Sequence, residues 1–253
     1  MNPYPKSNPL IILFLCIAGY ASAQQFNSDS YLSKPHGMIT IIPTVGERNS
    51  MLMNTFSLFS RWEFTIAAYL YNNDADPKTD DGYSTSLFVK YMIYENKKKT
   101  GGFAVKGGTG MFPGTLEKEE RERDAFQTYW MNTPVTLPFL DNKLQVDLMP
   151  GSSLTRNYRD THKDAVAFTY SGRVAWYIDS KWSAVGEIFG SEGKTRSAPE
   201  YKIGPRWEPS QYAVFAVTYG QEFSTSYGAG FEVGVMLFTP AFAQLSFKRK
   251  AEK

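Results

Sequence analysis

The chain of 253 residues is 42% hydrophobic and 21% charged, and its aromatic share of 15% is high. This apolar content argues against disorder throughout, and a mean hydropathy of -0.35 without an apolar run of about 18 residues excludes a bundle of membrane helices. The 27 basic and 25 acidic residues nearly cancel, so nothing favours a nucleic-acid partner. Because there are only two histidines and one cysteine, we expect no metal site and no cofactor.

Residues 1–23 have the pattern of an export signal. Lys6 precedes a short apolar run at 10–18, and residues 21–23 (Ala-Ser-Ala) form a small-x-small cleavage site. A short membrane anchor is the alternative. Cleavage leaves residues 24–253, which contain no cysteine. An exported chain of this size without disulfides is consistent with a single large β-structure.

After the signal, apolar and polar residues alternate with a period of two, which is typical of strands. The clearest case is 165–178, where Val166 and Trp176 share an apolar face. Proline weakens two of the predictions, because Pro134 and Pro150 cannot donate ladder hydrogen bonds. The twelve predicted strands are 37–43, 51–60, 62–71, 83–94, 102–112, 125–136, 143–154, 165–178, 182–190, 200–208, 211–221 and 228–238.

Short and long connections alternate between these strands. The short ones are 60–61, 95–100, 137–142, 179–181 and 209–210. The long polar ones are 72–82, 113–124, 155–164, 191–199 and 222–227, and the intermediate 44–50 is grouped with them. Strict alternation is typical of barrels with short periplasmic turns and long outer loops.

The predicted fold is therefore all-β, a closed antiparallel up-and-down transmembrane β-barrel of about 12 strands. We expect one barrel domain at residues 24–238. Residues 239–253 are expected to form a periplasmic tail or the end of the last strand. A soluble β-sandwich is the alternative, although it has no reason for alternating connection lengths.

Charged residues fall on the strand face opposite the apolar one. A Lys or Arg facing lipid at mid-membrane costs roughly 2–4 kcal/mol, so the charged face should point inward. The residues that we expect to line the lumen are Glu63, Lys90, Lys106, Arg173, Glu187, Lys202, Arg206 and Glu232. Two roles remain open for them: filtering solutes in a pore, or filling a closed barrel with salt bridges.

Four tryptophans lie on the apolar face beside three of the proposed short turns. They are Trp62, Trp176, Trp182 and Trp207. Tryptophan favours the boundary between membrane and water, because its ring is apolar and its N–H can donate a hydrogen bond. We therefore predict that these four are membrane-interface aromatics.

Several segments are similar, in a consistent order, to those of a known family. They are 59–64 (FSRWEF), 87–91 (LFVKY), 107–114 ending in Met-Phe-Pro-Gly, 182–189, 203–207 and 231–238. Over residues 50–238 the chain resembles the outer-membrane β-barrel family of putative transporters named for the meta-pathway of phenol degradation. The resemblance implies a channel or transporter for small or hydrophobic molecules. Such barrels often end on an aromatic residue, whereas here Phe238 is followed by a further tail.

The predicted function is passive or gated passage of a small solute through a charged lumen in the cell outer membrane. The alternatives are a non-transporting structural or surface barrel, and an outer-membrane lipid-modifying enzyme. The enzyme is not favoured, because His162 in a predicted outer loop and His36 at the periplasmic start of the first strand cannot cooperate. Expected partners are outer-membrane lipid, a small-molecule solute and the barrel-assembly machinery.

Overall fold

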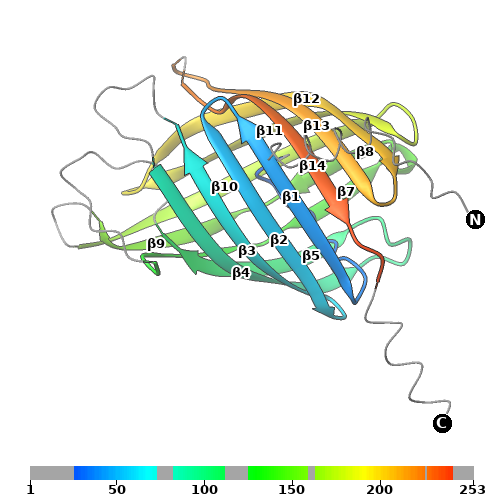
Figure 1. Ribbon diagram of the computed structural model, residues 1–253, viewed down its shortest axis with the longest axis horizontal. Helices are drawn as coiled ribbons and strands as arrows, with labels where there is room; N and C mark the ends of the chain where they lie inside the picture. The colour runs from blue at the N-terminus through cyan, green and yellow to red at the C-terminus, as the bar shows by residue number, and fades with distance from the viewer. Residues whose placement is uncertain (1–25, 73–81, 112–124, 159–162, 226, 242–253) are drawn as a thin grey trace, which may run out of the picture.

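The computed structural model describes residues 26–72, 82–111, 125–158, 163–225 and 227–241. Fourteen strands form one antiparallel sheet, and pairing of the last strand with the first closes it into a barrel (Figure 1). The strands are β1 (Met38–Gly46), β2 (Asn49–Phe59), β3 (Trp62–Tyr71), β4 (Gly82–Glu95), β5 (Gly102–Gly110), β6 (Thr128–Asn132), β7 (Val135–Phe139), β8 (Leu144–Leu148), β9 (Gly151–Tyr158), β10 (Lys163–Tyr177), β11 (Trp182–Gly193), β12 (Ser197–Ser210), β13 (Ala213–Glu222) and β14 (Gly230–Phe238). The predicted all-β up-and-down barrel is confirmed.

The wall has twelve strand positions, because two strands are interrupted. β5 pairs with both β6 and β7, and β10 pairs with both β8 and β9. The interruptions lie at Pro134 and Pro150, the two prolines that weakened the sequence prediction. Their carbonyl groups still accept hydrogen bonds from neighbouring strands, Pro134 O from Ala104 N at 2.9 Å and Pro150 O from Thr133 N at 2.9 Å.

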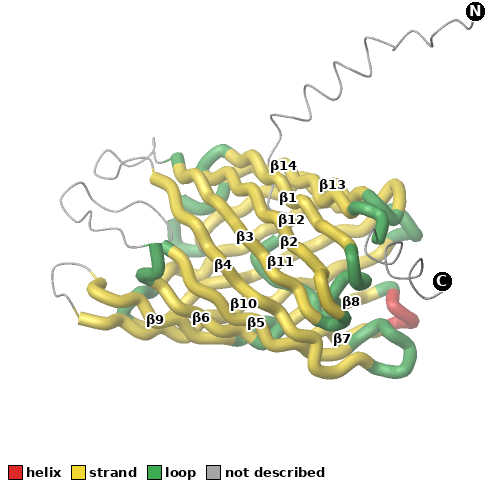
Figure 2. The backbone as a smooth tube through the Cα atoms, turned by 60° about the horizontal axis from the view of Figure 1, so that its bottom comes forward, coloured by secondary structure: helices red, strands yellow, loops and turns green. Residues whose placement is uncertain are grey.

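The barrel has two different ends, and its strands run obliquely between them (Figure 2). At what we call the terminal end, β1 begins and β14 finishes, and the turns are short, including a 3-10 turn (Leu140–Asn142) between β7 and β8. At the opposite end, which we call the loop end, β3 and β5 finish and β4 and β6 begin. Among the described residues, no helix is long and apolar enough to span a membrane.

The prediction that short and long connections alternate strictly was wrong. Residues 47–48 join β1 to β2 and residues 194–196 join β11 to β12, so two predicted long connections at the loop end are tight turns. Hydrogen bonds extend the strands into polar residues that the sequence analysis assigned to the connections. Glu47 donates its N–H to Phe231 O at 2.9 Å, and the Ser191 hydroxyl closes the second turn by accepting from Ser197 N at 2.8 Å.

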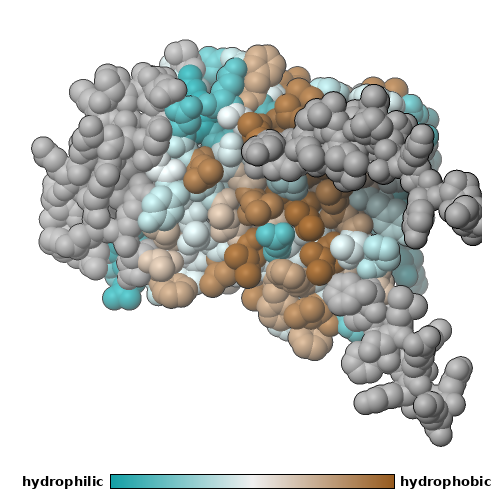
Figure 3. All heavy atoms as spheres, in the orientation of Figure 1, coloured by the Kyte–Doolittle hydropathy of each residue, from teal (hydrophilic) through white to brown (hydrophobic). Residues whose placement is uncertain are grey.

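The outer face of the wall is apolar, and Figure 3 shows hydrophobic residues grouped on it. Ile66, Phe168, Ile203 and Phe231 are each more than half exposed. Their inward neighbours are small or polar, and Thr65, Ala167 and Lys202 are buried. This inside-out distribution is the opposite of a water-soluble fold and is that of a barrel in lipid.

Residues 26–34 lie inside the barrel and belong to no strand; we call them the lumen segment. Phe26 packs against buried alanine and valine side chains of β10, β11 and β13. Tyr31 packs on the far side against Met92 of β4 and an alanine of β5. The segment thus crosses the bore from one wall to the other. A Cβ atom at Gly102 would lie 2.7 Å from the Tyr31 ring, so a glycine in β5 leaves room for this ring.

Candidate functional site

The charged residues predicted from sequence occupy facing positions on neighbouring strands. Glu63 of β3 lies opposite Lys90 of β4, which lies opposite Lys106 of β5. A second row crosses four strands in the order Asp147, Arg173, Glu187 and Lys202. In both rows the side chains are largely or fully buried. The register therefore builds two rows of ionic groups inside the wall.

Two ion pairs join residues of the predicted set to each other. Lys90 Nζ lies 2.7 Å from Glu63 Oε2, and Lys202 Nζ lies 2.7 Å from Glu232 Oε2. All four side chains are at most 7% exposed. A buried charge is tolerated only when paired and hydrogen-bonded, so these pairs are fixed parts of the interior.

The two predicted arginines pair with acids that the sequence analysis did not single out as site residues. Arg173 Nη2 lies 2.7 Å from Asp147 Oδ2, and Asp147 also accepts from the hydroxyl of Thr136 at 2.5 Å. Arg206 Nη2 lies 3.0 Å from Glu208 Oε1 on the same strand. Asp147 lies on the polar face of its strand, and that alternation is the signal that marks it.

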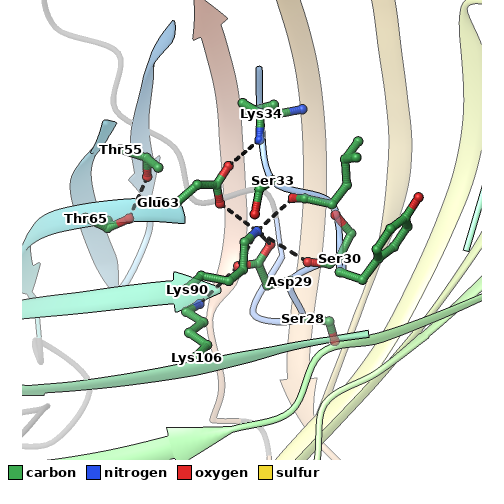
Figure 4. A network of polar contacts seen from close by, with 12 residues as sticks. Ser28, Asp29, Ser30, Ser33, Lys34, Thr55, Glu63, Thr65, Lys90 and Lys106 are labelled. Carbon is green, nitrogen blue, oxygen red and sulfur yellow. Dashed lines mark hydrogen bonds and ion pairs between the residues drawn. The ribbon is translucent and has the colours of Figure 1, made fainter. Parts of the chain in front are cut away.

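Asp29 of the lumen segment joins two like charges. Its carboxylate lies 3.3 Å from Lys90 Nζ and 3.4 Å from Lys106 Nζ (Figure 4). Lys90 and Lys106 face each other across β4 and β5, and facing like charges repel. Burial alone would raise the pKa of Asp29, but the two ammonium groups and the nearby Arg173 outweigh it and hold that pKa well below its usual range.

Near the terminal end, wall side chains satisfy the backbone of the lumen segment. Lys90 Nζ donates to the carbonyl oxygens of Ser30 at 3.4 Å and Leu32 at 2.9 Å. Glu63 Oε1 accepts from Lys34 N at 2.7 Å, as Figure 4 shows. Because buried backbone groups need partners, these bonds replace the strand pairing that the segment lacks.

The far end of the segment is held by Glu187 and Arg173. Glu187 accepts from the backbone N–H of Asn27 at 2.8 Å and from that of Ser28. Arg173 Nη1 donates to the Ser28 carbonyl at 3.0 Å, and its guanidinium carbon lies 5.8 Å from the centre of the Phe26 ring. Lys106 and Glu187, which pair with no other predicted residue, thus find their partners in the segment.

Two further contacts fix the middle of the segment and its connection to β1. Tyr31 N donates to Thr136 Oγ1 at 3.2 Å, and burial together with the carboxylate of Glu95 raises the pKa of the Tyr31 phenol to about 12. The Lys34 ammonium lies 4.3 Å from the centre of the Phe238 ring, and burial lowers its pKa.

The half of the lumen toward the loop end holds a cavity of about 860 Å³, which we call the vestibule. Its lining is rich in serine and threonine, namely Ser84, Thr85, Ser86, Thr128, Ser153, Thr155, Thr169, Ser171, Ser191, Thr195 and Ser197. Its aromatic lining residues are Tyr69, Tyr71, Trp130, Tyr170, Phe189 and Tyr227. Of the eight charged residues predicted for the lumen, Lys202 alone borders it, and Asn27 of the lumen segment forms part of its lining.

The four predicted interface tryptophans lie near the terminal end and are between 38% and 57% exposed. Trp62 begins β3, and its ring centre lies 4.6 Å from that of Tyr91. Trp182 and Trp207 stack with ring centres 5.8 Å apart, and Trp176 lies near the end of β10. Their contact with lipid remains a prediction.

Two histidines were weighed for catalysis. His36 precedes β1 at the terminal end, and His162 lies outside the described residues. Within the part of the chain that the structure describes, no three His, Cys, Asp or Glu residues are grouped as a metal site.

The barrel is similar in structure to solved outer-membrane proteins. The COG4313 outer membrane channel from Pseudomonas putida F1 matches with a TM-score of 0.55 and 9% identity, over 85% of this chain and 99% of that chain. The NanC porin matches with a TM-score of 0.52 and 11% identity, over 79% of this chain and 98% of that chain. No protein-family model and no curated protein matches the sequence. At these identities the likeness establishes the barrel fold, while membership of the phenol meta-pathway family stays a prediction.

Proposed function

We propose that this protein is an outer-membrane channel for a small solute, whose path runs through the vestibule and is closed toward the periplasm by the lumen segment. One observation carries the proposal: the vestibule ends on a chain segment that fills the bore and is not part of the wall. A solute that enters the vestibule therefore meets a closure that can move without opening the barrel.

Placement in the outer membrane is supported by the surface and by the expected export signal. Apolar side chains cover the outside, and charges are kept within. Exposed aromatic rings lie near the terminal end, where Trp182 and Trp207 stack. The likeness to solved outer-membrane barrels agrees with this placement.

Gating is supported by the way in which the lumen segment is attached. Its contacts to the wall are side-chain hydrogen bonds, ion pairs and packing, whereas barrel closure depends on the separate pairing of β1 with β14. Gly37, with a φ of 85°, lies between the segment and β1 and can serve as its hinge.

The charged residues set the selectivity of the open path in this proposal. When the segment moves away, Lys106 loses Asp29 and Glu187 loses the N–H groups of Asn27 and Ser28. Lys90 keeps Glu63, and Lys202 keeps Glu232. We therefore assign the charge preference of the open channel mainly to Lys106 and Glu187.

Conductance across planar lipid bilayers tests the proposal. Replacing Asp29 by Ala removes the shared partner of Lys90 and Lys106, so we expect more frequent opening and higher mean conductance than in the unmodified chain. Asp164→Ala, which removes an exposed carboxylate from β10, should leave conductance unchanged. A heat-modifiable gel shift verifies that each variant is folded. An equally closed Asp29→Ala barrel would contradict gating by this segment.

A structural barrel without transport is the second candidate, and the buried ion pairs favour it. Lys90 with Glu63 and Lys202 with Glu232 are arranged as in a filled interior. This candidate predicts a folded barrel that remains sealed in every variant that weakens the lumen segment.

A further inference from the structure

We propose that the vestibule is a binding site for an uncharged polyhydroxylated molecule of the saccharide class. This inference rests on the proposed function, because it names the class of solute that enters the path. It depends on the hydroxyl groups, the aromatic rings and the charge state of the vestibule lining.

The hydroxyl groups of the lining have hydrogen-bonding capacity left over. The Thr128 and Thr155 hydroxyls lie 3.3 Å apart and bond to each other, and Thr169 donates to Asn132 Oδ1 at 3.0 Å. A hydroxyl carries one donor and two acceptor positions, so such bonds leave acceptor positions unused on each oxygen. A ligand with many hydroxyl groups matches this lining.

Ser171 provides an independent sign of a missing partner. It is 8% exposed, it borders the vestibule, and its hydroxyl has no hydrogen-bond partner among the described residues. It lies on the inward face of β10, next to Arg173, which holds the lumen segment. Buried polar groups are rarely left unpaired, so a ligand hydroxyl at the floor of the vestibule would satisfy Ser171.

Aromatic rings border the same cavity. Tyr69 and Tyr71 are stacked on β3 with ring centres 6.3 Å apart, and Trp130 borders the cavity from β6. The C–H faces of a sugar ring pack against aromatic surfaces, while its hydroxyl groups point sideways to polar partners. Apolar surface combined with a few placed polar groups is the usual composition of a small-molecule site, and about 860 Å³ is within the usual size.

The charge state of the lining favours an uncharged ligand. Lys202 is paired with Glu232 at 2.7 Å, and Arg196 lies 3.6 Å from Glu192. Glu200 accepts from Ala229 N at 2.8 Å. An acidic ligand would find Lys202 and Arg196 already paired with acids and Arg48 held over the Tyr227 ring at 5.5 Å, and a purely apolar ligand would cover hydroxyl groups without bonding to them.

Equilibrium binding to the full chain in micelles of a sugar-free detergent tests the inference. Isothermal titration uses three neutral saccharides, maltotriose, cellobiose and lactose, beside trigalacturonate as the acidic probe and toluene as the apolar one. We expect saturable binding of at least one neutral saccharide, with toluene and trigalacturonate weaker. Binding of none of the three, or tighter binding of the acidic or the apolar probe, would overturn the inference.

A matched pair of variants locates the site. Ser171→Ala should weaken saccharide binding about tenfold, because it removes one ligand hydrogen bond. Ser183→Ala removes another buried hydroxyl that has no hydrogen-bond partner within the described residues, on β11 near the terminal end and away from the vestibule lining, and should leave the affinity unchanged. Equal effects of the two variants would place binding elsewhere.

The outcome is separable from that of the channel proposal. Binding in micelles does not require passage of the solute. Binding to a barrel that never conducts would therefore contradict only the channel proposal. Conductance without saccharide binding would contradict only the inference of a saccharide site.

Discussion

The half of the lumen toward the terminal end and the half toward the loop end differ in chemistry and in what fills them. The first is crossed by the lumen segment and contains ionic groups such as Glu63, Lys90 and Arg173. The second is an open vestibule with hydroxyl and aromatic lining, in which the one predicted charge, Lys202, is already paired. The inward charges therefore hold a piece of the chain in place, while the neutral groups remain available to a solute.

The need to compensate buried charge explains this division. Facing ammonium groups such as Lys90 and Lys106 are unfavourable unless an acid joins them, and Asp29 is that acid. Hydroxyl groups can bond to one another, as Thr128 and Thr155 do, and need no such partner. A lumen half built on hydroxyls therefore needs no charged partner.

The largest expected effect comes from replacing Lys90 by Met. Lys90 contacts Glu63, Asp29 and two carbonyl groups of the lumen segment, so its loss leaves the buried Glu63 carboxylate without its ion pair and Asp29 with Lys106 alone. We expect unfolding in micelles, followed by tryptophan fluorescence in urea, to lose about 3–5 kcal/mol of stability. We also expect conductance to rise.

Lys202→Met is the matched control, because it removes an equally buried lysine that pairs with Glu232 and, within the described part of the chain, does not bond to the lumen segment. It should lower stability by a similar amount while conductance stays low. Equal conductance in the two variants would remove the distinction between the two halves.

Low pH should reduce the stability that the Asp29 ion pairs contribute to the half of the lumen toward the terminal end. Because Lys90, Lys106 and Arg173 hold the pKa of Asp29 below its ordinary value of 3.8, the ionised carboxylate contributes stability that is fully present above that value. The contribution is lost as the pH falls through the lowered pKa. Comparing the unmodified chain with Asp29→Asn isolates it from the other carboxylates.

The stability difference between these two proteins should stay constant from neutral pH down to about pH 4 and shrink below it. Glu63, which also bonds to Lys90, is present in both proteins. A difference that vanishes already at pH 6, or persists undiminished in strong acid, would argue against the ion pair.

The wall could be predicted from sequence because alternation is a local signal. The pattern in 165–178 matches β10, and Pro134 and Pro150 mark where two strands break. The prediction of long connections was wrong at residues 47–48 and 194–196. Polar residues near the end of a strand resemble loop residues in sequence, and only the cross-strand hydrogen bonds show that they belong to the strand.

The site could be predicted only in part. Inward charges such as Glu63 and Lys90 follow from alternation, but their pairing depends on the register between strands. The lumen segment has no periodic pattern, and Asp29 matters only because Lys90 and Lys106 face each other in the closed barrel. The vestibule likewise assembles hydroxyl groups from strands far apart in the chain.

The occupancy of the bore by residues 26–34 is tested most directly by thiol protection. Ser28→Cys places a thiol where the side chain is 3% exposed and where the native hydroxyl makes no hydrogen bond within the described residues. Ser180→Cys in the exposed turn between β10 and β11 serves as the reference, with Cys16 replaced by Ser in both. We predict that a bulky maleimide labels residue 180 at once in the folded barrel and residue 28 only after unfolding; equally fast labelling of both would show that the segment does not occupy the lumen.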